Sequence, residues 1–380
     1  MPRALLFFLA ITLSATASGD ILGLFGDDDL TDGSRFAFVP SKSDQTIIAI
    51  DTQDHKVAAT LEISHVAGSV VPTNELDLLV ATNPDGGTAT IINLYNRQVI
   101  TELDLGMRPD VVLANAYDRF VTFGSEDGSI STWDLSNFQQ VVRVDGLSSA
   151  LLLTFSFDGG RLFVVEPEEK KISVIDMAKR AKAAEISLGT GDDAEMQASA
   201  ISRSADGYTG YVSIGSEDRV VVIDLVKLEV KGSIRVGAGP IRPFSTSDNQ
   251  YVLVPNLDDE TLSVISSWSQ NVVATIPTGI PAREVNTGWL DTVAFVMPAE
   301  GKEMAVIDLQ DFKAMEPISL PGRTDDGIVT SDSKTLVASV VETGEVAVAD
   351  ARSGKLVTLI DTGTSELGGI EIAVSNNVCH

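Results

Sequence analysis

Short apolar segments that alternate with polar residues recur along the chain at a regular spacing. One stretch at residues 261–281, TLSVISSWSQNVVATIPTGIP, contains an apolar run, a polar turn, a second alternating run and a closing Gly-x-Pro. Alternation with a period of two predicts β-strands that bury one face, and no 3.6-residue helical period is visible. The pattern therefore predicts short strands joined by tight polar turns.

The end of one strand in each copy marks the register of a repeat. Segments such as TIIAID, KISVID and RVVVID end at a polar residue, and these register marks are Asp51, Asn93, Asp134, Asp176, Asp224, Ser266, Asp308 and Asp350. Neighbouring marks lie 41 or 42 residues apart, except for one spacing of 48 residues that includes an insertion around residues 189–199. A fixed period of about 40 residues with four alternating segments per copy is typical of β-propeller blades.

The register marks predict an all-β fold, an eight-bladed β-propeller over residues 34–375 with four antiparallel strands in each blade. The first copy begins with SRFAFVPS at residues 34–41 and lacks an innermost strand, whereas GGIEIAVS at residues 368–375 follows the last copy. We expect this C-terminal strand to complete the first blade, because the pairing covers two strand edges that would otherwise be exposed. Seven blades are the alternative if the terminal segments do not pair.

One copy carries a resemblance to a known repeat. Residues 251–281, YVLVPNLDDETLSVISSWSQNVVATIPTGIP, resemble the YVTN-type β-propeller repeat, and VKGSIRVGAGP and ITELDLGMRP are weaker copies of its ending. The resemblance implies a fold rather than an activity, since the superfamily includes surface proteins, chaperone-like periplasmic proteins and cofactor-binding domains. The blade count is also similar to that of the haem d1-binding propeller of cytochrome cd1 nitrite reductases.

The first residues of the chain predict an export signal. Arg3 precedes an apolar stretch, and Ala15 and Ala17 form an A-x-A cleavage site. We expect a signal peptide at residues 1–17, an acidic lead-in at residues 18–33 and a C-terminal tail at residues 376–380. The apolar stretch is too short to span a bilayer. The sequence therefore predicts a periplasmic or secreted protein without membrane insertion.

Charge and cysteine content narrow the range of partners. The chain has 54 acidic against 27 basic residues and a formal net charge of −27, which disfavours binding to nucleic acid. Its single cysteine is Cys379, so an internal disulfide is not expected, in keeping with a bacterial periplasm. Cys379 and His380 form only half of the C-x-x-C-H motif that attaches haem. A small anionic ligand or another exported protein is the expected partner.

Charged residues recur in the loops that lead from one blade to the next, which a propeller places around one opening of its central channel. The candidate ligand-binding residues are Arg108, Asp110, Arg242, Arg283, Glu284, Arg323 and Asp326. Arginine presents a planar fork that suits carboxylate or phosphate, so a ring of them could bind a small anion or the carboxylate of a cofactor. Alternatively, each arginine pairs with a neighbouring acid and simply holds adjacent blades together.

Metal binding and catalysis have weaker support in the sequence. His65, with Asp193 or Asp326, could bind zinc, but no H-x-H or H-x-x-x-H spacing accompanies it. No nucleophile elbow, phosphate-binding loop or internal cysteine is present, so no catalytic residue is predicted. The sequence favours an exported binding or accessory protein rather than an enzyme. The alternatives are a periplasmic zinc chaperone, or a cofactor-holding enzyme or subunit of the haem d1 or quinoprotein dehydrogenase propeller type.

Overall fold

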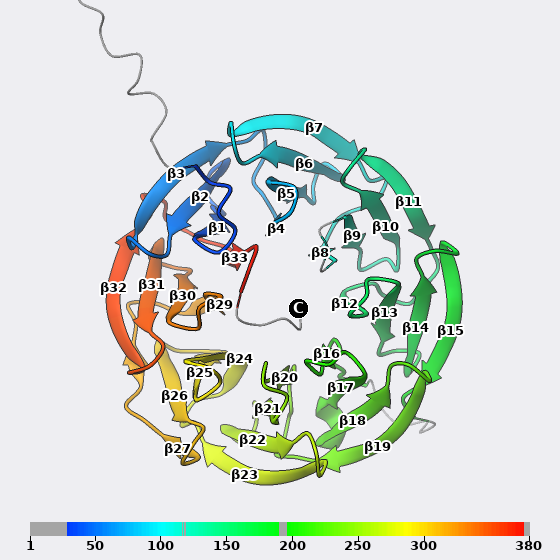
Figure 1. Ribbon diagram of the computed structural model, residues 1–380, viewed down its shortest axis with the longest axis vertical. Helices are drawn as coiled ribbons and strands as arrows, with labels where there is room; N and C mark the ends of the chain where they lie inside the picture. The colour runs from blue at the N-terminus through cyan, green and yellow to red at the C-terminus, as the bar shows by residue number, and fades with distance from the viewer. Residues whose placement is uncertain (1–28, 116, 118, 190–195, 376–380) are drawn as a thin grey trace, which may run out of the picture.

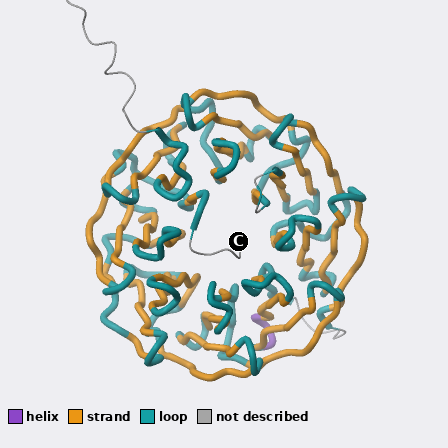
Figure 2. The backbone as a smooth tube through the Cα atoms, in the orientation of Figure 1, coloured by secondary structure: helices purple, strands orange, loops and turns teal. Residues whose placement is uncertain are grey.

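The alternating segments form β-strands that assemble into eight antiparallel sheets arranged in a ring around a central channel, as Figure 1 shows. The structure is a computed structural model and describes residues 29–115, 117, 119–189 and 196–375. Strands account for nearly all regular structure in these residues, and the one helix among them is the short 3₁₀ segment η2 (Gly215–Glu217), visible in Figure 2. The predicted eight-bladed all-β propeller is therefore confirmed.

Each blade runs from an innermost strand at the channel to an outermost strand at the rim. Blade 1 contains β33 (Glu371–Ile372), β1 (Phe36–Pro40), β2 (Thr46–Asp51) and β3 (Lys56–Glu62). Blade 2 contains β4 (Val70–Pro72), β5 (Leu78–Asn83), β6 (Thr88–Asn93) and β7 (Gln98–Asp104). Blade 3 contains β8 (Val111–Ala114), β9 (Phe120–Gly124), β10 (Ile130–Asp134) and β11 (Gln139–Val144). Blade 4 contains β12 (Leu152–Phe155), β13 (Arg161–Glu166), β14 (Lys171–Asp176) and β15 (Ala181–Ser187).

The second half of the ring repeats this order. Blade 5 contains β16 (Ser202–Arg203), β17 (Thr209–Ile214), β18 (Arg219–Asp224) and β19 (Glu229–Arg235). Blade 6 contains β20 (Phe244–Ser245), β21 (Tyr251–Asn256), β22 (Thr261–Ser266) and β23 (Asn271–Pro277). Blade 7 contains β24 (Ala282–Gly288), β25 (Val293–Pro298) and β26 (Glu303–Asp308), and its outer edge is divided into β27 (Lys313–Ala314) and β28 (Ile318–Ser319). Blade 8 contains β29 (Thr324–Val329), β30 (Thr335–Val340), β31 (Glu345–Asp350) and β32 (Lys355–Asp361).

The ring closes through blade 1, whose innermost strand comes from the C-terminal end of the described chain. In the pairing of β33 with β1, Ile372 lies opposite Ala37 and Glu371 lies opposite Phe38. Beside the strand, the amide of Gly368 donates to the carbonyl of Pro40 at 2.9 Å. The predicted closure is thus confirmed. The predicted signal peptide, most of the acidic lead-in and the C-terminal tail lie outside the described residues.

The register marks seen in the sequence have one structural role. Each is the last residue of the third strand of its blade, and its side chain accepts a hydrogen bond from a backbone N–H of the following turn. Four residues after each mark the backbone adopts a positive φ, at His55, Arg97, Phe138, Arg180, Leu228, Gln270, Phe312 and Gly354. Asp, Asn and Ser recur at the marks because their short polar side chains stabilise such turns.

The core lies between neighbouring blades, where the sheets pack face to face. One cluster joins Phe295 and Val306 of blade 7 to Leu336 and Val340 of blade 8. Middle strands are buried on both faces and are therefore almost continuously apolar, whereas outer strands such as β15 are mostly exposed and bury a single residue near their end. No helix in the described part of the chain is long and apolar enough to cross a membrane.

Candidate functional site

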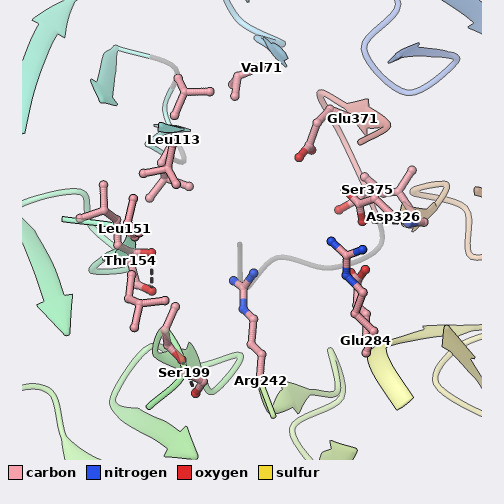
Figure 3. Close-up of a pocket in the computed structure, with 18 of the residues that line it drawn as sticks. Val71, Leu113, Leu151, Thr154, Ser199, Arg242, Glu284, Asp326, Glu371 and Ser375 are labelled. Carbon is pink, nitrogen blue, oxygen red and sulfur yellow. Dashed lines mark hydrogen bonds between the residues drawn. The ribbon is translucent and has the colours of Figure 1, made fainter. Parts of the chain in front are cut away.

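A cavity of about 930 Å³ occupies the centre of the ring. It is lined by the innermost strands and by the loops that precede them, so residues from most blades contribute to its wall. Figure 3 shows that apolar side chains gather on one side of this space and charged side chains on the other. The two sides are called the apolar wall and the charged wall below.

The apolar wall comes from blades 2 to 4. Val71 lies on β4, Leu113 on β8, and Leu151 and Leu152 lie at the start of β12, and all four line the cavity. Their side chains are partly exposed because the innermost strands face the channel instead of another sheet. Thr154, beside them, donates its hydroxyl to the carbonyls of Leu153 and Ile201 at 2.8 and 2.9 Å, so this hydroxyl is already hydrogen-bonded. Glu75 of blade 2 also lines the cavity.

The charged wall comes from four consecutive blades. Arg242 lies in the loop before β20, Arg283 and Glu284 on β24, Asp326 on β29 and Glu371 on β33. In Figure 3, Arg242 and Glu371 both point into the cavity, and Glu284 and Asp326 lie between them around the ring. The wall therefore brings three carboxyl groups and two guanidinium groups into one part of the channel.

Two irregular strands place the central charged residues. The pairing of β24 with β25 shifts register between Ala282 and Glu284, and the pairing of β29 with β30 shifts between Thr324 and Gly327. A β-bulge of this kind inserts an extra residue and turns a side chain away from its regular direction. These register shifts occur at the positions that carry the charged side chains of the two strands.

Hydrogen bonds hold the carboxyl groups of the charged wall. The amide nitrogen of Asn286, a buried residue on β24, donates to Glu284 Oε1 at 3.2 Å and to the carbonyl of Gly327 at 2.8 Å. The backbone N–H of Gly327 donates to Asp326 Oδ1 at 2.8 Å. The carboxyl group of Asp326 lies close enough to that of Glu284 to act on its acidity. Blades 7 and 8 are thereby linked at the cavity surface.

The surroundings change the acidity of two carboxyl groups. Burial, the charge of Asp326 and the hydrogen bond with Asp326 raise the pKa of Glu284 well above its usual range, although Arg242 acts in the opposite direction. Burial and the charge of Asp326 raise the pKa of Glu371 to about 8, again against the influence of Arg242. Glu371 therefore keeps its proton at neutral pH.

Four of the seven candidate ligand-binding residues line the cavity, namely Arg242, Arg283, Glu284 and Asp326. The other three lie outside its lining. Arg108 is exposed and pairs with Asp110 at 2.7 Å and with Asp85 at 3.3 Å, and Arg323 is paired with Glu342 at 4.0 Å. For these two arginines, pairing with a nearby acid is the arrangement that the structure contains.

The candidate metal ligands are not brought together. His65 does not line the cavity, its Nδ1 lies 3.4 Å from the hydroxyl of Ser64, and burial lowers its pKa. Asp193 lies outside the described residues. Within residues 29–375, apart from the undescribed positions, no three His, Cys, Asp or Glu side chains form a group that could hold a metal ion.

Sequence reasoning did not identify Glu371 or the apolar wall. Glu371 belongs to GGIEIAVS, the segment predicted to close the first blade. An acidic residue within a short apolar strand that faces the channel was the available signal. The apolar wall gave no such signal, because Leu113 or Leu151 is indistinguishable in sequence from residues that pack between sheets.

Comparison with known proteins shows a likeness in three dimensions only. No protein-family model and no curated protein matches the sequence. The dihydro-haem d1 dehydrogenase NirN, solved in complex with DHE, superposes with a TM-score of 0.74 at 17% identity, covering 92% of this chain and 77% of that one. The Cps50 (Swd1) propeller domain of Myceliophteria thermophila gives a TM-score of 0.60 at 14% identity, over 75% of this chain and 96% of that one. The likeness is one of fold.

A third structure, a protein of unknown function from Desulfotomaculum acetoxidans, gives a TM-score of 0.58 at 12% identity and covers 90% of this chain and 99% of that one. At such identities a shared fold does not carry a shared activity. The likeness in fold therefore does not indicate the chemistry of the cavity, which depends on its own side chains.

The described lining of the cavity contains no residue that could coordinate a haem iron. Haem iron is held in proteins by His, Cys, Met or Tyr. None of these residue types is found among the described residues that line the cavity. The described lining thus does not fit an iron-coordinated haem, although its size and its apolar wall suit an organic molecule.

Proposed function

We propose that this chain is an exported β-propeller that binds a small amphipathic anion in its central cavity. The observation that carries the proposal is the division of one cavity into an apolar wall and a charged wall that presents Arg242 and Arg283. An amphipathic anion would place its hydrophobic body against the first wall and its acidic group against the second.

The dimensions and the charge of the cavity support this ligand class. Its volume of about 930 Å³ lies within the range of pockets for small organic molecules, roughly 300–1,000 Å³. Arg242 forms no hydrogen bond or ion pair with another described side chain. Its guanidinium group can therefore donate hydrogen bonds to an acidic group of the ligand without breaking an existing pair. The protonated state of Glu371 removes one negative charge that would otherwise repel an anion.

Export and repeat family complete the proposal. Residues 1–17 have the pattern of a signal peptide, which supports a periplasmic or secreted location. The ending VVATIPTGIP supports a YVTN-type origin for the repeats. Binding rather than catalysis is proposed because an apolar wall and guanidinium groups in one cavity suit the holding of an amphipathic anion, and the sequence predicts no catalytic residue.

Isothermal titration with three ligands that share one alkyl chain tests the proposal. Decanoate, decanol and decylammonium, each used below its aggregation concentration at pH 7, differ only in the charge of the head group. We expect decanoate to bind most tightly, decanol weakly and decylammonium not measurably. Arg242→Ala should lower the affinity for decanoate about 10- to 100-fold, because a charge-assisted hydrogen bond contributes about 1.5–3 kcal/mol.

Arg108→Ala is the matched control, since it removes the same charge from an exposed loop outside the cavity. Its affinity for decanoate should equal that of the unchanged protein. Equal binding of decanol and decanoate, or equal losses in the two variants, would overturn the assignment of the charged wall. Absorbance of protein purified from its native host separately tests for a bound haem. A visible absorption band would contradict the conclusion that the described lining does not fit an iron-coordinated haem.

A further inference from the structure

The charged wall has more acidic than basic groups, which is unexpected in a site for an anion. Glu284, Asp326 and Glu371 face Arg242 and Arg283. If all three carboxyl groups were ionised, the wall would carry a net negative charge and would repel an anionic ligand. Binding of an anion here therefore requires that protons remain on the wall.

The neighbouring pair Glu284 and Asp326 also favours a proton on this wall. The pKa of Glu284 is raised well above its usual range by burial and by Asp326. The pair therefore holds a carboxylic acid next to a carboxylate at neutral pH. Asn286 donates to the same Glu284 side chain, so the pair is fixed in place.

Glu371 has no equivalent carboxylate partner among the described residues. The charged groups that act on it are Asp326 of β29, which disfavours ionisation, and Arg242 of the loop before β20, which favours it. The remaining charged side chains that line the cavity are Glu75, Asp258, Arg283 and Glu284. Glu371 itself points into the open space that Arg242 also enters from the other end of the charged wall (Figure 3).

We propose that Glu371 binds a carboxylate on the ligand through a shared proton, so that the cavity selects carboxylates and takes up a proton when Glu371 is ionised beforehand. The inference rests on the function proposed above and specifies the ligand's acidic group. The Glu371–ligand pair would repeat the arrangement that Glu284 and Asp326 already show. Arg242 would neutralise the single negative charge that this pair retains.

The proton balance makes the proposal measurable. Below about pH 7 Glu371 already carries its proton, so binding a carboxylate changes no protonation state. Above about pH 8 Glu371 is ionised in the free protein and must regain a proton from solvent. Affinity should then fall about tenfold for each pH unit, and about one proton should be taken up per ligand bound.

Titration calorimetry of decanoate and decane-1-sulfonate tests the proposal, in buffers of different ionisation enthalpy at pH 6 and pH 9.5. The two ligands share a chain and a charge, but a sulfonate is too weakly basic to share a proton. At pH 6 we expect decanoate to bind about tenfold more tightly than decane-1-sulfonate, because the hydrogen bond with a shared proton contributes about 1.4 kcal/mol. Uptake of about one proton at pH 9.5 should accompany decanoate binding.

Glu371→Gln keeps the shape of the side chain and a permanent N–H donor but cannot ionise. In this variant the affinity for decanoate should become independent of pH between 6 and 9.5, and proton uptake should vanish. Glu366→Gln is the matched control, because Glu366 is exposed, lies five residues earlier in the chain and does not line the cavity. Circular dichroism of both variants verifies the fold.

The outcomes separate the two proposals. Absence of binding by both decanoate and decane-1-sulfonate would overturn the proposed function together with this inference. Equal binding of the two ligands, with no proton uptake at pH 9.5, would leave the proposed function intact and overturn the role of Glu371. Loss of pH dependence in Glu366→Gln as well as in Glu371→Gln would also contradict that role.

Discussion

The two walls of the central cavity are built on equivalent strands but are held by different means. On the apolar wall, the innermost strands β4, β8 and β12 have three or four residues and pair without irregularity. On the charged wall, β24 and β29 have seven and six residues and each contains a register shift. The side chains of the apolar wall need only line a surface, whereas Glu284 and Asp326 lie at shifted positions and are held there by hydrogen bonds.

The difference also shows where a repeat protein can vary. The third strands and the turns that follow them are alike in all eight blades, down to the capping side chain and the positive φ. The innermost strands share none of this uniformity. Because the packing between blades depends on the middle strands, the channel surface can change from one blade to the next at little cost to the ring.

Placing a charge on the apolar wall should have the largest effect. Leu113→Asp removes apolar contact area and puts a second acidic surface opposite Glu371. The affinity for decanoate should fall roughly 100-fold, since loss of a buried leucine contact costs about 1.5–3 kcal/mol and repulsion adds to it. Decylammonium should gain affinity. Leu113→Met is the control, and unchanged decanoate binding by Leu113→Asp would show that the ligand does not contact this wall.

Removing the support of the charged wall should lower stability. Asn286→Ala deletes the donor to Glu284 and leaves the buried carbonyl of Gly327 without that partner. We expect the free energy of unfolding to fall by about 2 kcal/mol in urea denaturation. Gln310→Ala, an exposed amide on an outer turn, should change it by less than about 0.5 kcal/mol. If the two variants lost the same free energy of unfolding, the hydrogen bonds of Asn286 would contribute no more to stability than an exposed amide does.

The pKa of Glu371 predicts how stability varies with pH. Its pKa rises from 4.5 in the unfolded chain to about 8 in the folded protein, so the stabilisation from this group is complete below about pH 4.5 and is lost as pH rises to about 8. Glu371→Gln should therefore melt a few degrees above the unchanged protein at pH 9 and close to it at pH 4.5. Scanning calorimetry measures this difference. A constant offset across the pH range would contradict the raised pKa.

The smallest effect is expected where a charged residue lies outside both walls. Arg108→Ala combined with Arg242→Ala should bind decanoate within about twofold of Arg242→Ala alone, because distant sites act additively and exposed ion pairs contribute little. Calorimetric titration of the double variant provides the measurement. A further loss beyond tenfold would place Arg108 at the ligand and extend the charged wall to blade 3.

The sequence was sufficient to predict the ring but only part of the cavity. The capping residues at the ends of the third strands are local signals, so the repeat and the blade count could be derived from them. The closure followed from the missing innermost strand of the first copy and the extra strand after the last one. Arg242 and Arg323 occupy equivalent loops, yet only Arg242 lines the cavity. Which way such a side chain points depends on bulges and loop contacts between blades, and neither has a pattern in one sequence.

Glu371 lies on the strand that closes the ring, and this couples the site to the integrity of the ring. The site contains residues from blades 6, 7 and 8, and β33 adds Glu371 by pairing with β1, a strand that is far from it in the sequence. Opening of the first blade would therefore remove the acidic group from the cavity. A ligand held by Glu371, as proposed above, would in turn stabilise the pairing of β33 with β1.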